Sequence, residues 1–134
     1  MKITWLGHSG FRIEIEDQTL LIDPWLTGNP VFPEERRDEA TEGATHLLVS
    51  HGHGDHSADA LAIAKAQSIP VAAIWDLTTW WEASEGIQTV GFNKGGTVML
   101  GKVAVTMVNA VHSSSIAGEG GKPVYSGAEA GFMI

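Results

Sequence analysis

The sequence predicts an α/β protein built on a mixed β-sheet, and two observations carry this prediction. Short apolar segments alternate with stretches rich in Gly, Asn and Pro along all 134 residues, as expected of strands separated by turns. Between residues 57 and 85 the apolar spacing becomes helix-like, then strand-like, then helix-like again, which indicates helices interleaved with strands. No linker or repeat divides the chain, so we treat residues 1–134 as part of one domain with no internal boundary.

The first expected strands form a hairpin. Residues 11–16 alternate apolar and polar side chains with period two, as a half-buried strand does. After a turn at Asp17-Gln18, residues 19–22 are the return strand, and Asp23-Pro24 ends it because proline has no N–H for the ladder. Residues 25–45 are expected to be loop-like.

A short buried strand at residues 46–50 leads into the most polar motif of the chain. The helix expected at residues 57–66 can be capped by Ser57, with Asp59 near the positive end of its dipole. The other expected elements are a helix at residues 78–85 and strands at residues 70–74, 87–90, 96–100 and 102–111.

Composition excludes several classes of protein. The formal net charge of −8 disfavours binding to nucleic acid or to an anionic membrane surface. The chain has no cysteine, so any metal ion must be held by histidines and carboxylates. The first residues are too quickly polar for a signal peptide, and no apolar run approaches the ~20 residues of a membrane span. A cytoplasmic location is expected.

Residues 51–56 read His-Gly-His-Gly-Asp-His, a pattern with the chemistry of a metal site. In an extended segment His51 and His53 point the same way and can hold one ion together. His56 turns away as the chain enters the helix, so a second ion can take Asp55 and His56. These ligands suit zinc first, with manganese or iron as further options. The alternative is a surface loop that is His-rich by chance, which the position between a buried strand and a helix disfavours.

The motif at residues 51–56 resembles the signature of the metallo-β-lactamase fold superfamily. The opening Ile3–Phe11, with Leu21–Pro24 and Gly28–Pro30, is similar to a narrower branch of metal-dependent hydrolases related to the UlaG-like lactonases. The resemblance covers essentially the whole chain. It implies a metallo-β-lactamase-like αβ/βα sandwich, of which this chain supplies the first, N-terminal half and little of the second. It also implies a hydrolase that uses a metal-activated water on a small-molecule ester, lactone, amide or phosphodiester.

The resemblance further implies a ligand set for two zinc ions. His51, His53 and a later histidine, matched by His112 after the apolar strand, would bind the first ion. Asp55 and His56 would bind the second, and Asp55 would also help to aim the water during catalysis.

Other residues are implied to act beside the ligands. Asp23 would orient a ligand histidine through a hydrogen bond. His8 would lie near the pocket and stabilise charge on the substrate, although a solvated loop histidine fits the sequence equally well. Trp75, Trp80 and Trp81 can wall a pocket, but such aromatics more often belong to the core or face a partner.

The ligand set in this chain is short of the family's full set. The family adds a bridging aspartate and a final histidine from its second half, whereas only Glu119 and Glu129 follow His112 as acidic residues. We therefore expect the N-terminal portion of a longer hydrolase. A half-domain completed by a homo-oligomer or a second chain, and an inactive relative, are alternatives. Rival functions are a metal-binding module without catalysis and a di-iron redox protein with a flavin partner.

Overall fold

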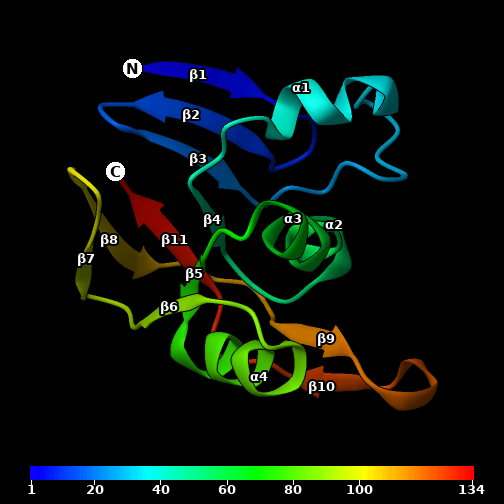
Figure 1. Cartoon of the computed structure of the whole chain (residues 1–134). Helices are drawn as coiled ribbons and strands as arrows, with labels where there is room; N and C mark the ends of the chain where they lie inside the picture. Colours follow the sequence, from blue (N-terminus) through cyan, green and yellow to red (C-terminus); the bar gives the residue numbers. More distant parts are fainter.

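The computed structural model describes residues 1–134 as a six-stranded sheet, a three-stranded sheet and a short hairpin, with helices between them (Figure 1). The strands of the larger sheet lie in chain order. They are β1 (Lys2–Trp5), β2 (Phe11–Ile15), β3 (Gln18–Ile22), β4 (His46–Val49), β5 (Val71–Ile74) and β6 (Thr89–Phe92). The β1–β2 and β2–β3 pairs are antiparallel, and β3 to β6 are parallel, so the mixed sheet is confirmed.

The parallel strands form the centre of the core. All of β5 and the residues Leu47, Leu48 and Val49 of β4 are buried, as expected of strands that are covered on both faces. Because β3 and β4 are parallel, Asp23 and Ser50, which follow them directly, come out at the same edge of the sheet. The candidate site is built at this edge, where α/β sheets commonly place ligands.

Short helices connect the strands. They are η1 (Glu34–Arg36), α1 (Arg37–Thr41), α2 (Gly54–Ser57), α3 (Ala60–Gln67), α4 (Trp75–Glu85) and η2 (Glu119–Gly121). In Figure 1, α2 and α3 lie on one side of the parallel strands, and β7 and β8 lie on the other. No helix has the length and apolar character needed to cross a membrane.

The second sheet is antiparallel and has the order β11-β8-β7. Its strands are β7 (Thr97–Leu100), β8 (Val103–Asn109) and β11 (Ala130–Met133), and the hairpin consists of β9 (Ser115–Ala117) and β10 (Pro123–Tyr125). Every second side chain along the first part of β8 is buried in the core, namely Val103, Val105 and Met107. Phe92 of β6 stacks on Phe132 of β11 at 6.3 Å between ring centroids, so the two sheets share one core.

Three local predictions are wrong. Ser57 does not cap a helix: it ends α2, and its Oγ donates to the carbonyl oxygens of Gly52 and His53, each at 3.0 Å. The later helix begins at Trp75 rather than residue 78, and residues 25–45 contain η1 and α1 instead of loop alone. Local residue patterns locate element boundaries only to within a few residues, and differences of this kind are expected.

Candidate metal centre

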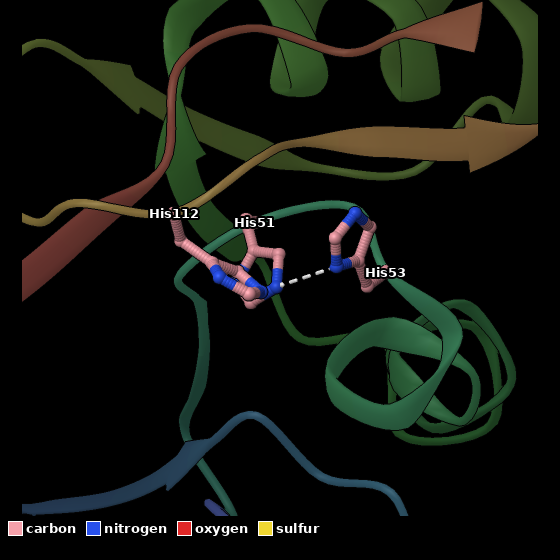
Figure 2. A group of neighbouring side chains, drawn as sticks. All are labelled: His51, His53 and His112. Carbon is pink, nitrogen blue, oxygen red and sulfur yellow. Dashed lines mark hydrogen bonds between the residues drawn. The ribbon is translucent and has the colours of Figure 1, made fainter. Parts of the chain in front are cut away.

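Three histidines from two separate segments form the first cluster. His51 and His53 follow β4, and His112 follows β8. Figure 2 shows the three imidazoles turned toward one another. His51 Nε2 lies 3.2 Å from His53 Nδ1, and the ring centroid of His112 lies 4.8 Å from that of His51 and 5.2 Å from that of His53. The fold thus brings together residues that are about sixty positions apart in the chain.

A second cluster consists of His8, Asp55 and His56. Asp55 and His56 lie in the first turn of α2, and His8 comes from the loop between β1 and β2. Asp55 Oδ2 is 3.0 Å from His8 Nε2 and 3.8 Å from His56 Nε2. The His8 and His56 rings meet edge to face at 5.1 Å between centroids.

The two clusters adjoin. The rings of His51 and His56 are 4.1 Å apart between centroids, which joins one cluster to the other. A cavity of about 380 Å³ opens above them, and its lining includes His8, His51, Asp55, His56, His112 and Glu129. A volume of this size falls within the ~300–1,000 Å³ of small-molecule sites.

The donor sets fit divalent metal ions. Metal–nitrogen and metal–oxygen bonds of ~2.0–2.2 Å place neighbouring donors of one ion roughly 3–4 Å apart. The His51–His53, His8–Asp55 and Asp55–His56 separations of 3.2, 3.0 and 3.8 Å agree with that spacing. Imidazole and carboxylate donors suit zinc, and also manganese or iron. The role of these residues as ligands stays a prediction that the geometry supports.

Asp23 connects the two clusters through hydrogen bonds. Its Oδ2 accepts a bond from Ser50 Oγ at 2.6 Å and lies 2.9 Å from His56 Nδ1. Ser50 Oγ is in turn 2.9 Å from His51 Nδ1, and the Ser50 backbone N–H donates to Asp23 Oδ1 at 2.7 Å. One buried carboxylate therefore reaches a histidine of each cluster.

This network fixes which ring nitrogens carry protons. An ionised carboxylate can only accept, so His56 Nδ1 must be the donor to Asp23. Since the Ser50 hydroxyl already donates to Asp23, His51 Nδ1 must donate to Ser50. When neutral, each of these two histidines therefore has an unprotonated Nε2, which is the form that binds a metal ion.

Burial and charge act on the titration of the site in opposite directions. Burial, followed by the neighbouring His56 and His53, lowers the pKa of His51 to about 4, so this ring is neutral at neutral pH. Burial also acts to lower the pKa of His56, but the hydrogen bond and charge of Asp23 outweigh it and raise that pKa. For Asp55, burial acts to raise the pKa, while His56, the Asp55 backbone N–H and His8 together lower it.

The loop that carries His8 holds a costly backbone conformation. His8 has φ of 49°, in the left-handed region that non-glycine residues avoid at a cost of ~1–2 kcal/mol. Gly7, with φ of 90°, lies so close to Asn29 that an added Cβ would approach its side chain to 2.8 Å. Trp5 Nε1 donates to the His8 carbonyl at 3.0 Å, and Trp25 meets the His8 ring edge to face. Tertiary contacts therefore hold His8 in the cavity wall.

Asp59 stabilises the neighbouring loop around Leu26 and Thr27 through hydrogen bonds. Its carboxylate is buried and accepts from the backbone N–H groups of Leu26 and Thr27 at 2.7 and 2.9 Å. It also accepts from Arg37 Nη1 at 2.6 Å. The segment that it fastens carries Trp25 and Asn29, which contact the His8 loop. Asp59 thus supports the second cluster from a distance.

Two residues of the site escaped the sequence analysis. Ser50 joins Asp23 to His51, and its only sequence signal is a polar residue between a buried strand and a histidine. Glu129 has no role in the sequence analysis beyond being one of two acidic residues after His112, yet it lines the cavity together with His112. Lys94 Nζ lies 3.8 Å from its carboxylate.

Comparison with known proteins is consistent with this geometry. A family described as the beta-lactamase superfamily domain matches residues 2–134. A metal-dependent hydrolase of Dinoroseobacter shibae is 68% identical over all 134 residues, and the chain spans 58% of that relative's length.

Solved structures share the fold. A metallo hydrolase from Ignicoccus hospitalis has a TM-score of 0.76 and 25% identity, over 97% of this chain and 53% of its own. CmlA, a diiron β-hydroxylase from Streptomyces venezuelae, has a TM-score of 0.69 at 20% identity, over 97% of this chain and 26% of its own, which shows a common fold alone. The chain therefore belongs to the beta-lactamase superfamily and has the metallo-β-lactamase fold that its histidine motif predicts.

Proposed function

We propose that this chain supplies the metal centre of a metal-dependent hydrolase. The observation that carries the proposal is the pair of adjoining clusters, each with three donor residues, five of the six donors lining one cavity. Three protein donors are typical of catalytic zinc sites, which keep a position free for water or substrate, whereas structural sites usually have four. The name of the Dinoroseobacter relative, metal-dependent hydrolase, supports the same reaction class.

Zinc ions bound in such a pair would polarise a substrate oxygen and lower the pKa of a bound water toward ~7. The protein's own contribution is orientation. Asp23 holds the Nε2 atoms of His51 and His56 toward the cavity. Asp55 stays ionised beside them and can accept a hydrogen bond from an attacking water.

Two roles are open to His8. It can donate a hydrogen bond to a developing oxyanion of the substrate, as the resemblance implies. It can also serve as the third donor of the second cluster. The 3.0 Å contact with Asp55 and the edge-to-face contact with His56 favour the second role, because donors of one ion lie at such distances.

The substrate class in this proposal is a small-molecule ester, lactone, amide or phosphodiester. The cavity over the clusters has the size of a small-molecule site. The net charge of −8 opposes binding to a nucleic-acid backbone. A di-iron redox function is less well supported, because the two clusters contain five imidazoles and only one carboxylate.

Metal analysis together with hydrolysis tests the proposal. We expect the purified protein to bind about two zinc ions, to show no flavin absorbance, and to hydrolyse simple esters or lactones. His53→Ala and Asp55→Ala should abolish turnover while the circular dichroism spectrum is unchanged. His46→Ala is the matched control, because His46 lies outside both clusters and contacts Gln18 instead. Full activity of either site variant in metal-free buffer would show that the assignment is wrong.

A further inference from the structure

A second cavity begins beside His53 and runs away from the metal centre. A space of about 260 Å³ is lined by His53, Gly54 and the hairpin residues Ser115 and Pro123. A larger space of about 430 Å³ is lined by Gly54, Leu61, Trp80, Trp81 and Ile116. The two share Gly54, Ile116 and Ala117, so they form one groove between the β9–β10 hairpin and helices α2, α3 and α4. We call it the Gly54 groove.

The part of the Gly54 groove that lies away from His53 is mainly apolar. Leu61 and Ile116 are half-buried and pack against the core, and Trp81 is buried at 5% exposure. Two polar side chains at its margin, Ser57 and Glu85, already have partners. Ser57 Oγ donates to backbone carbonyls, and Glu85 accepts from Lys65 Nζ at 2.7 Å. The groove thus offers apolar contact rather than an available charge.

Two glycines of the motif differ at this point. A Cβ on Gly52 would collide with Ser126 and Ile116, so Gly52 is required by close packing. A Cβ on Gly54 would meet nothing within 4 Å, and Gly54 has no left-handed φ. Packing and backbone geometry therefore do not explain a glycine at position 54. Gly54 lines both spaces, so a larger side chain at this position would extend into the groove.

We propose that the Gly54 groove binds the apolar acyl chain of the substrate, with the scissile carbonyl at the His53 end and the chain running past Gly54 toward Trp80. This inference rests on the proposed hydrolase function and narrows its substrate to esters, lactones or amides of medium-length apolar acids. His53 belongs to the first cluster and also lines the near end of the groove, and this shared residue is what assigns the groove to substrate. The acyl chain would gain contact with Leu61, Trp80 and Ile116.

The first experiment measures binding alone. Bromo-octanoate is added to the zinc-loaded full chain in which Trp5, Trp25 and Trp75 are replaced by Phe, so that quenching of tryptophan emission reports bromine next to Trp80 and Trp81. Gly54→Leu should weaken the quenching strongly and Gly54→Ala more weakly, because the passage narrows in proportion to the side chain. Ala66→Leu, which adds bulk to an exposed position of α3, should leave the quenching as in the wild type. Circular dichroism checks the fold of each variant.

The second experiment measures hydrolysis of 4-nitrophenyl acetate, butyrate and octanoate. We expect kcat/KM to rise about three- to fourfold for each added methylene, the value for a fully buried CH₂. The ratio of octanoate to acetate should fall in Gly54→Leu and keep its wild-type value in Ala66→Leu. Quenching that is the same in wild type and Gly54→Leu overturns the proposal that the groove binds the acyl chain, whatever the hydrolysis shows. Quenching that depends on Gly54, without hydrolysis of any ester, overturns the hydrolase proposal and leaves the groove standing.

Discussion

The two metal clusters are neighbours, but the fold supports them in different ways. His51 of the first cluster lies two residues after a buried strand and is itself only 4% exposed. In the second cluster the side chains of His8 and Asp55 are 41% and 45% exposed, and His8 depends on a loop in a left-handed conformation. The first cluster is therefore placed by segments that follow strands, and the second by helix α2 together with the loop that carries His8. We expect the second cluster to be the more easily disrupted.

The largest effect is expected where one residue serves both clusters. Asp23→Ala removes the acceptor of His56 and of Ser50, so both histidines lose their orientation. Loss of such a partner typically costs ~10–100-fold in metal affinity, here at each of two sites. Zinc titration with a competing chelator should show both affinities reduced. Asp38→Ala on the exposed face of α1 is the control. If Asp23→Ala weakened zinc binding at one site and left the affinity of the other unchanged, Asp23 would not serve both clusters.

A large loss of stability is expected from Asp59→Ala. The substitution leaves Arg37 and two backbone N–H groups without their acceptor in a buried setting. Breaking a buried pair by removing one partner costs ~3–5 kcal/mol. Urea unfolding of the metal-free protein measures this cost. Arg36→Ala, which breaks an exposed pair with Glu39, should change the unfolding free energy far less. Equal losses of unfolding free energy in the two variants would contradict a stabilising role of Asp59.

The contrast between the clusters also explains what the sequence could predict. His51, His53, Asp55 and His56 are close in the chain, so their spacing alone divided them between two ions, and the structure brings His112 to the first pair. His8 was undecided, because its position depends on contacts with Trp25 and Asn29 some twenty residues away. Local patterns do not contain contacts of that kind.

The strands and helices likewise divide into those defined by local sequence patterns and those defined by contacts with distant residues. The strands at residues 11–22 and 46–49 were predictable because their apolar pattern follows from burial by the core. The strand β1 (Lys2–Trp5) was not assigned, since its side chains are largely exposed and only its pairing with β2 defines it. Ser57 was assigned to a cap because serine is common there, whereas its hydroxyl bonds the carbonyls that follow β4.

Two smaller effects of opposite sign are expected when His8 is replaced: weaker zinc binding and higher stability of the metal-free protein. His8→Gly removes a donor of the second cluster and should reduce zinc binding from about two ions to about one at limiting zinc. The same change relieves the left-handed backbone and should stabilise the metal-free protein by ~1 kcal/mol. Zinc stoichiometry and urea unfolding of the chelated protein measure the two effects. A protein that is less stable yet still binds two ions would show that His8 has a structural role instead.

The smallest effect is a dependence of stability on pH that arises from Asp59. Burial acts to raise the pKa of this carboxyl, but the N–H groups of Thr27 and Leu26 and the guanidinium of Arg37 outweigh it and lower the pKa below 3.8. A carboxyl whose pKa is lower in the folded state stabilises the protein fully above its unfolded pKa and loses that contribution as the pH falls through the folded value. Stability of the wild type should therefore decrease more steeply than that of Asp59→Asn as the pH falls below about 4. Unfolding curves of the metal-free proteins test this, and parallel pH profiles would show that Asp59 does not stabilise the loop beside His8 through its charge.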